Sequence, residues 1–373
     1  MRTISLIIMI ALFFTACKQE REILPSGKIL KIGVMAPLGG KYKRLGNQGL
    51  IGLKAANKMN RYLKNGDEIV FEIVDTKSEL KNSKKVLSEL AKKDIKAIIS
   101  FMGSSETLSM KQDFKDYKIP TVLTLATDNN LVSKGGYISQ VCIDNDTQVL
   151  IASHYIRDEK LIQKVGVIYN KDSYYSSILA KQFKNYFISI GGSVEFFLDL
   201  NKQNALNRFE NMKKKDIKML YNTSNGVLSA KILDIMNRKN FDFDMLGADG
   251  LYSDVLELGH NKLKLFDGVY VVEHYAHNAN RDSNYERLEK ILDKDGFNES
   301  SNAFLAYDSY QLLMHALEKC SDYSLECIDA TFENSGIIKG VAGNFSMVDS
   351  KVKREVYINK IENSLLKKEV VIY

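Results

Sequence analysis

The sequence lacks several patterns that would assign it to well-known classes of protein. Its opening apolar run, residues 4–14, falls well short of the roughly 20 residues that a helix needs to cross a bilayer. The 52 basic and 46 acidic residues are interspersed, with no long cationic block of the kind that binds nucleic acid. No Gly-x-Ser-x-Gly motif and no catalytic Cys/His pair is present. These absences argue against a nucleic-acid-binding protein and against an enzyme.

The cysteine and histidine pattern offers no metal site. None of the four cysteines belongs to a CxxC motif or to a Cys/His spacing typical of zinc sites. His274 and His277 lie close together, but no third ligand stands near them in the sequence. We therefore interpret them as surface or structural histidines and expect neither a metal nor a cofactor.

The N-terminus has the features of a secretory signal peptide. Arg2 gives a short cationic region, residues 4–14 are mostly apolar, and the small residues Thr15 and Ala16 precede Cys17. This ending resembles the bacterial lipobox, in which the cysteine becomes the acylated first residue of the mature chain. Two acyl chains there would give a stable membrane anchor. We expect residues 1–16 to be removed, Cys17 to be lipidated and residues 17–27 to form a polar tether; a plain secretory signal is the alternative.

The other cysteines fit an exported protein. Cys320 and Cys327 flank a short polar turn, and an oxidising compartment would allow a local disulfide between them. Two unpaired thiols are the alternative. Cys142 ends the stretch 138–142 and is expected to be a buried strand residue.

From Lys28 onward, apolar strand patterns alternate with amphipathic helix patterns. This alternation predicts βαβ units with parallel sheets covered on both faces. The predicted strands fall at residues 29–35, 69–74, 97–102, 120–125, 165–169, 194–198, 217–221 and 245–246. The rhythm restarts after Asp144, which indicates two doubly wound, Rossmann-like α/β lobes joined by a hinge.

The last third of the chain is expected to be shared between the two lobes. Residues 269–319 contain too few strand patterns for a lobe of their own, so we expect them to return to the first lobe. The tail from Val356 to Tyr373 reads as antiparallel strands. The predicted boundaries give a first lobe of residues 28–145 plus 274–345 and a second lobe of 146–273 plus 346–373.

The residues that follow the predicted strands are the candidate ligand site, because open α/β sheets bind ligands beyond the carboxyl ends of their strands. Residues 103–107 open a helix with Gly-Ser-Ser, which suits a carboxylate, although simple N-capping by Ser104 or Ser105 explains them equally well. Further candidates at such ends are the small residue Ala126 with the hydroxyl of Thr127, the aromatic Tyr174, and Asp249 between glycines.

These segments resemble the type I periplasmic binding proteins, specifically the leucine/isoleucine/valine-binding branch. Residues 31–40, KIGVMAPLGG, with Leu45-Gly46 and Gly52, are similar to that family's first strand and loop. The segments 103–127, 170–174 and 247–250 are similar to its ligand-site loops. The resemblance extends over residues 28–373.

The resemblance implies an α-amino-acid head-group site. It places the carboxylate on the hydroxyls of Ser104 and Thr127, and the ammonium on the main-chain carbonyl of Leu125 and on Asp249. Tyr174 would close over the ligand from the second lobe. Leu45, Gly103, Ala126 and Asn225 would complete the pocket lining.

Two departures from the family concern the ligand's side chain. Leu45 stands where relatives carry an aromatic residue, and residues 222–225, NTSN, are polar where binders of aliphatic ligands are often rich in Gly and Tyr. A small polar or amide-like ligand is therefore compatible with the sequence.

The function implied is capture of an amino acid outside the cytoplasm, by hinge closure, for the permease of an ABC transporter. We expect a monomer that meets the membrane only through its lipid and that binds no nucleic acid. A sensor, or a binder of amides, ureas or other small solutes with the same fold, is the alternative. An extracytoplasmic enzyme has no motif in its favour.

The Cys17 hypothesis is directly testable. Cys17→Ser removes the thiol that would be acylated, so it should abolish metabolic labelling with a radioactive fatty acid and release the protein into the soluble fraction. Ser5→Ala, inside the apolar run, is the matched control and should stay labelled. Unchanged membrane retention of Cys17→Ser would refute acylation.

Overall fold

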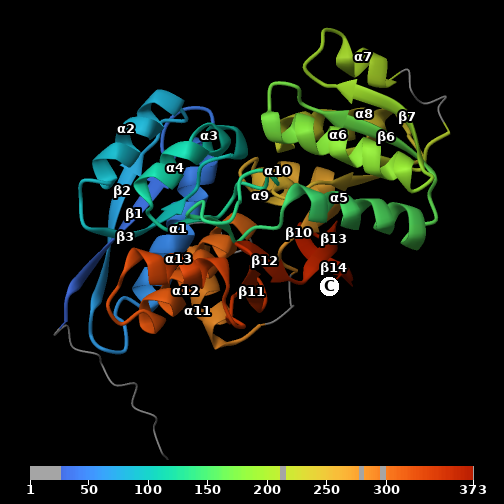
Figure 1. The fold of residues 1–373 in the computed structure, drawn as a ribbon. Helices are drawn as coiled ribbons and strands as arrows, with labels where there is room; N and C mark the ends of the chain where they lie inside the picture. The colour runs from blue at the N-terminus through green and yellow to red at the C-terminus, as the bar shows by residue number, and fades with distance from the viewer. Residues whose placement is uncertain (1–26, 211–215, 277–280, 295–299, 373) are drawn as a thin grey trace, which may run out of the picture.

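The computed structural model describes residues 27–210, 216–276, 281–294 and 300–372. The chain folds into two lobes that lie side by side, each built on a β-sheet with helices packed against it (Figure 1). The predicted α/β class with two doubly wound lobes is confirmed. Cys17, the signal peptide and the tether up to residue 26 lie outside the described residues, as does His277.

Within the described residues, the first sheet has seven strands in the order β11-β12-β5-β4-β3-β1-β2. All neighbours pair in parallel except β11 and β12, which form an antiparallel hairpin at one edge. The strands are β1 (Ile29–Ala36), β2 (Glu68–Asp75), β3 (Ile95–Ser100), β4 (Thr121–Leu123), β5 (Ile138–Gln140), β11 (Phe345–Val348) and β12 (Lys351–Arg354).

The second sheet, over the same described part of the chain, also has seven strands, in the order β14-β13-β10-β9-β8-β6-β7. Four pairs are parallel, and the C-terminal hairpin adds two antiparallel pairs, as the tail pattern predicted. The strands are β6 (Lys164–Tyr169), β7 (Ser193–Asp199), β8 (Met219–Asn222), β9 (Asp244–Gly247), β10 (Tyr270–Glu273), β13 (Val356–Glu362) and β14 (Leu365–Ile372).

Helices cover both sheets, which explains the nearly continuous apolar strands. The first lobe has α1 (Lys43–Met59), α2 (Leu80–Leu90), α3 (Ser104–Ser109), α4 (Lys111–Tyr117), α11 (Ser283–Asp293), α12 (Ser301–Lys319) and α13 (Leu325–Glu333). The second has α5 (Asn145–His154) with the π-helix η1 (Tyr155–Glu159), α6 (Tyr174–Ser189), α7 (Ala205–Glu210), α8 (Gly226–Lys239), α9 (Leu251–Leu256), α10 (His260–Leu263) and the 3₁₀ helix η3 (Lys264–Phe266).

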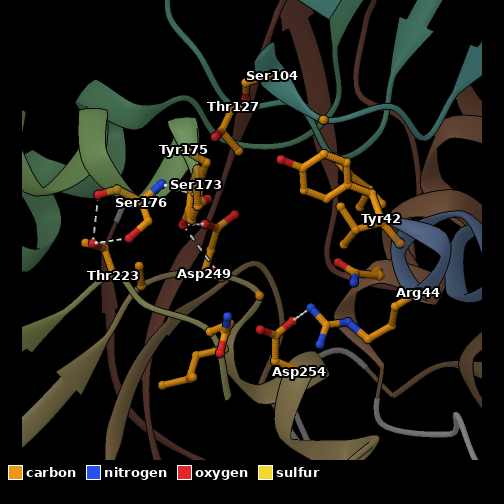
Figure 2. Close-up of a pocket in the computed structure, with 18 of the residues that line it drawn as sticks. Tyr42, Arg44, Ser104, Thr127, Ser173, Tyr175, Ser176, Thr223, Asp249 and Asp254 are labelled. Carbon is orange, nitrogen blue, oxygen red and sulfur yellow. Dashed lines mark hydrogen bonds and ion pairs between the residues drawn. The ribbon is translucent and has the colours of Figure 1, made fainter. Parts of the chain in front are cut away.

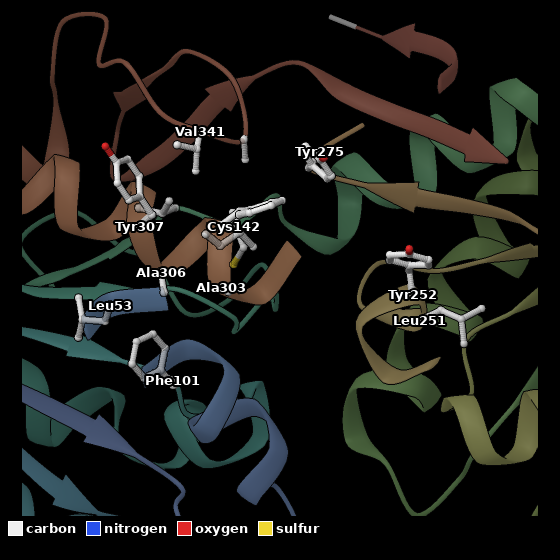
Figure 3. Packing of buried hydrophobic residues seen from close by; sticks show 14 of the residues in the cluster. Leu53, Phe101, Cys142, Leu251, Tyr252, Tyr275, Ala303, Ala306, Tyr307 and Val341 are labelled. Atoms are coloured by element: carbon white, nitrogen blue, oxygen red, sulfur yellow. The ribbon is translucent and has the colours of Figure 1, made fainter. Parts of the chain in front are cut away.

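The return of the chain to the first lobe depends on close packing of α12 against α1. A Cβ atom at Gly52 of α1 would lie 2.2 Å from the carbonyl oxygen of Ala303 of α12, so only glycine allows this approach. Figure 3 shows Leu53, Phe101 and Ala306 in the apolar cluster beside this contact. The sequence led us to expect residues 274–345 on the first lobe, and we propose that α11, α12 and α13 belong to it.

The chain crosses between the lobes at three places. It leaves the first lobe between β5 and α5, returns after β10, and leaves again between β12 and β13. The first two crossings are bonded to each other, because the backbone N–H of Ile143 donates to Nε2 of His274 at 3.0 Å. The third crossing lies beside the second, because Tyr357 pairs with Glu273 in the antiparallel ladder of β13 and β10. The three crossings are therefore adjacent strips of chain rather than separate linkers.

The third crossing differs from the boundary that the sequence suggested. The predicted division after residue 345 falls within β11, but β12 pairs with β5 and so keeps the whole β11–β12 hairpin on the first sheet. The chain crosses at Glu355 instead. We therefore propose that the first lobe extends to Arg354, whose guanidinium forms a fully buried ion pair with Asp308 of α12 at 2.5 Å.

Cys320 and Cys327 are joined by a disulfide that links the end of α12 to α13, with their Cα atoms 5.8 Å apart. Cys142 is a free, buried cysteine. Its side chain packs just beyond β5, and its thiol donates to the carbonyl oxygen of Ala126 at 3.2 Å.

The disulfide gives a prediction about stability. A short bridged loop stabilises a folded protein by about 2 kcal/mol, so the double variant Cys320→Ser/Cys327→Ser should lose about that much free energy of unfolding in urea. Reductant should lower the stability of the wild type by the same amount and leave the double variant unchanged. Mass spectrometry of non-reduced peptides should show the two cysteines linked; complete labelling of both thiols in the folded protein would contradict the bridge.

Candidate ligand-binding site between the lobes

A cavity of about 420 Å³ lies where the carboxyl ends of the parallel strands of both lobes face each other. This volume lies toward the lower end of the roughly 300–1,000 Å³ that is typical of small-molecule sites. Figure 2 shows side chains from both lobes pointing toward the cavity. Of the predicted site residues, Leu45, Gly103, Ser104, Leu125, Thr127, Tyr174, Asn225 and Asp249 line it.

Ser104 and Thr127 form the first-lobe wall. The Oγ of Ser104 accepts a hydrogen bond from the backbone N–H of Thr127 at 3.1 Å, which joins the ends of β3 and β4. The hydroxyl of Thr127 is buried and has no hydrogen-bond partner within the described part of the chain. A hydroxyl held in this way is available to a ligand.

Simple N-capping does not explain Ser104, because the N-cap of α3 is Gly103 and no side chain caps the helix. Gly103 lines the cavity and leaves it open at this point: a Cβ atom there would meet nothing within 4 Å. Donors of the loop and of the two hydroxyls therefore meet on one side of the cavity.

Ala126 does not line the cavity, contrary to the prediction. Its side chain is fully buried in the core beside Leu123 and Met102. Its carbonyl oxygen accepts a hydrogen bond from Nε2 of Gln140 at 2.7 Å. The chain alternates at this strand end, so that Leu125 and Thr127 face the cavity and the residue between them faces the core.

Asp249 forms the opposite wall, on the second lobe. It follows β9, and Gly250, with a φ of 75°, turns the chain into α9 directly after it. The hydroxyl of Tyr175 donates to its carboxylate, and its backbone N–H donates to Oε1 of Gln148 at 3.4 Å. Burial raises the pKa of Asp249 to about 6, although the bonds from Tyr175 and Gln148 partly oppose this shift. A cation beside this carboxylate would stabilise its ionised form.

The two neighbouring tyrosines at the start of α6 have different roles. Tyr174, the predicted aromatic, lines the cavity and donates from its hydroxyl to Oδ2 of Asp128 in the first lobe at 3.0 Å. Tyr175, which sequence reasoning did not select, is the one that contacts Asp249. The pair was visible in the sequence, but no pattern indicated which ring points to the acid.

Ser176 and Thr223 fix the loop behind Tyr175. Their hydroxyls lie 3.0 Å apart, and the Thr223 hydroxyl also donates to the carbonyl oxygen of Ser176 at 2.8 Å (Figure 2). Ser173 caps α6 by accepting from the backbone N–H of Ser176. The side chain of Asn225 caps α8 by accepting from the N–H of Leu228 at 3.0 Å. Asn225 also lines the cavity, although its side-chain oxygen Oδ1 is used for the helix cap.

Tyr42 supplies an aromatic ring on the first-lobe side, three residues before Leu45. Figure 2 shows its ring reaching into the cavity with the hydroxyl facing the Thr127 and Tyr175 side. From the sequence, Leu45 was expected to leave this wall without an aromatic ring, and Tyr42 was not considered. Tyr42 lies one helical turn before Leu45, and this spacing could have indicated that both residues face the same side.

Arg44 bridges the lobes at the edge of the cavity. Its guanidinium pairs with Asp254 of α9 and lies 3.8 Å from Oε2 of Glu257. Next to it, Nε2 of Gln48 donates to Oε1 of Glu257 at 2.8 Å. Burial raises the pKa of Asp254, and Arg44 counteracts part of that shift. Sequence reasoning missed this bridge because its partners lie in different lobes.

The sequence matches a known protein family over most of its length. The family model, described as periplasmic binding protein, matches residues 29–364. The chain belongs to this family. Its members are solute-binding proteins that work outside the cytoplasm with ABC transporters. No curated protein matches the chain.

Solved structures share the fold at low sequence identity. A leucine-binding protein LivK from Thermotoga maritima has a TM-score of 0.80 and 21% identity, covering 92% of this chain and 98% of that one. LivJ from Streptococcus pneumoniae, in complex with isoleucine, has a TM-score of 0.79 and 20% identity, covering 92% and 99%. A solute-binding protein from R. palustris, in complex with 4-hydroxybenzoate, has a TM-score of 0.78 and 18% identity, covering 92% and 97%.

The part of the chain that the structure describes has no candidate metal site. No group of three or more His, Cys, Asp or Glu side chains in it could hold a metal ion. None of the helices in that part is both long enough and apolar enough to cross a membrane.

The ion pair between Arg44 and Asp254 predicts that removal of Arg44 weakens both lobe closure and ligand binding. Arg44→Ala leaves Asp254 buried and unpaired whenever the lobes are together, which should cost at least about 2 kcal/mol of the closed form. Ligand affinity should fall about 30-fold, and small-angle scattering should show a larger radius of gyration without ligand.

Arg61→Ala is the matched control, because Arg61 pairs with Glu68 inside the first lobe. It should change neither quantity. Equal scattering curves and affinities for Arg44→Ala and wild type would show that the bridge does not hold the lobes.

Proposed function

We propose that this binding protein captures an α-amino acid by closure of its two lobes and delivers it to the permease of an ABC transporter. The observation that carries the proposal is the placement of Asp249 opposite Ser104 and Thr127 across one small cavity. A carboxylate fits the hydroxyl and N–H donors of the first lobe, and an ammonium fits the acid of the second. An α-amino acid has both groups on one carbon atom.

Asp249 also favours an amino acid over the aromatic carboxylates that some structural neighbours bind. A benzoate has a carboxylate for the first-lobe wall, but it offers no cation to Asp249. That carboxyl would then stay buried without a counter-charge, which is unfavourable. The amino-acid head group is favoured for this reason.

Closure follows from the positions of the contacts. The ligand's carboxylate would be held by the first lobe and its ammonium by the second, with the Leu125 carbonyl oxygen as a further acceptor. A ligand that binds both walls stabilises the arrangement in which they are close, and this differential contact shifts the protein toward the closed form. The permease would then distinguish the closed surface from the open one.

The cellular setting belongs to the same proposal. The signal peptide and Cys17 support a lipid-anchored protein outside the cytoplasm, tethered by residues 17–27 and acting as a monomer. An unbiased thermal-shift screen of amino acids, amides, ureas and aromatic acids is the first test. Stabilisation by amides, ureas or aromatic acids alone would replace the amino-acid proposal with the alternative.

The head-group site can be tested with variants of Asp249. Asp249→Ala leaves the ligand ammonium desolvated and unpaired, which costs about 2–5 kcal/mol and weakens binding roughly 30- to several-thousand-fold. Asp249→Asn should weaken it less, because the amide oxygen still accepts a hydrogen bond. Ser104→Ala should have a smaller effect, because backbone N–H groups still hold the carboxylate. Calorimetry with the amino acid found in the screen measures all three.

Two controls sharpen this test. Asp244→Ala removes an exposed acid from the far end of β9 and should bind like wild type. Lowering the pH through about 6 should weaken wild-type binding, because Asp249 must ionise to pair with the ammonium, and Asp249→Asn should lack this decrease. An affinity of Asp249→Ala within threefold of wild type, with the fold intact by circular dichroism, would show that no ammonium is bound there.

A further inference from the structure

Glu273 is a buried acid in the cavity wall that the proposed head-group site does not use. It is the last residue of β10, its side chain is 0% exposed, and it lines the same cavity as Asp249. Neither of its carboxyl oxygens has a hydrogen-bond partner within normal geometry in the described part of the chain. It therefore differs from Asp249, whose carboxylate is bonded to Tyr175.

The surroundings of Glu273 compensate its buried carboxyl only in part. Burial raises its pKa to about 8, and the negative charge of Asp249 adds to the shift. The hydroxyl of Ser301, at the start of α12, and the backbone N–H of His274 face the group and offset part of the shift. A buried polar group without a partner is uncommon in folded proteins and calls for an explanation. For a group in a cavity wall, one explanation is that a ligand supplies the partner.

The described cations around the cavity are engaged elsewhere or exposed. Arg44 pairs with Asp254 and Glu257, and Nζ of Lys41 donates to the carbonyl oxygen of Asp172 at 2.8 Å. Lys43 is exposed at the start of α1. If Asp249 takes the ammonium of the ligand, Glu273 is the remaining acid on the wall formed by β10 and α12.

We propose that Glu273 is the specificity-determining residue of the cavity and accepts a hydrogen bond from an N–H donor at the end of the ligand's side chain. The ligand is then an amino acid with an amide or ammonium side chain, not an aliphatic one. This inference rests on the proposed amino-acid function and adds the chemistry of the side chain. Ser301 and Asn302, which line the cavity beside Glu273, make the same wall polar.

The discrimination has a simple physical origin. An aliphatic side chain in the closed cavity would lie against Glu273 without bonding it, so the buried carboxyl would still lack a hydrogen-bond partner. A donor-bearing side chain of the same size makes the missing bond. Sites built to hydrogen-bond a ligand group reject the analogue that lacks it far more strongly than apolar pockets reject a missing methylene.

The test is calorimetry of the full mature protein with matched pairs of amino acids that differ in the donor. The pairs are asparagine and leucine, glutamine and methionine, and ornithine and norleucine. In at least one pair the donor-bearing member should bind at least tenfold more tightly. Preference within the glutamine or asparagine pair identifies an amide ligand, and preference within the ornithine pair identifies an ammonium ligand.

Two variants assign the preference to Glu273. Glu273→Met replaces the acid with an apolar side chain of similar length and should reduce the donor preference at least tenfold. It should also raise the unfolding temperature without ligand, because an unpaired buried acid is removed. Glu106→Gln is the matched control: Glu106 is another buried acid of the cavity wall, but its carboxylate accepts from Ser83. This change should affect both members of a pair alike.

The outcomes separate this inference from the proposed function. Tight binding of leucine, methionine or norleucine, equal to that of their partners within threefold, would overturn the inference and leave the amino-acid function standing. A donor preference that Glu273→Met does not change would also overturn it. Failure of every amino acid to bind would overturn both, and the wild-type measurements give that result even if the variant fails to fold.

Discussion

The site depends on one constraint, the parallel pairing of strands within each sheet. Parallel strands are connected by helices that cover the two faces, so each parallel strand ends in a loop at the same edge of the sheet. The two sheets present these edges to each other. Gly103 and Ser104 follow β3, Thr127 follows β4, Tyr174 follows β6, and Asp249 follows β9. Residues from distant parts of the sequence therefore meet in one cavity.

The three crossings of the chain keep these edges opposite each other. At the third crossing, Arg354 is the last residue of β12, and only Glu355 separates it from β13. The buried pair of Arg354 with Asp308 fixes the end of β12 to α12. Such a pair adds little net stability compared with an apolar contact, but removal of one partner leaves a buried charge. Its effect is to set where the first lobe ends and the connecting strip begins.

The sequence predicted the elements well because strand and helix patterns are local. It also indicated which residues after the strands would face a common cavity, because the rule that places ligands beyond strand ends needs only the order of the elements. Contacts between the lobes could not be predicted, since nothing local connects Arg44 to Asp254 or decides between Tyr174 and Tyr175. The lobe boundary was misplaced because pairing of β12 with β5 is a long-range contact.

Glu273 is a different case, because its signal was present. It directly follows an apolar run, residues 269–272, in the way that Asp249 follows β9. The sequence analysis considered only the neighbouring His274, as a possible metal ligand. In the structure Nε2 of His274 accepts from the backbone of Ile143, and burial lowers the pKa of the ring to about 3. The imidazole is therefore neutral and serves the connection between the lobes.

The hydrogen bond from Tyr174 to Asp128 has a consequence for the energetics of lobe opening. When the lobes separate, water hydrates the hydroxyl and the carboxylate instead, so the net free energy of the bond is only about 1.5–3 kcal/mol. Contacts of this strength can align the lobes without locking them. A binding protein whose lobes are joined by contacts of this strength can close around a ligand and still reopen.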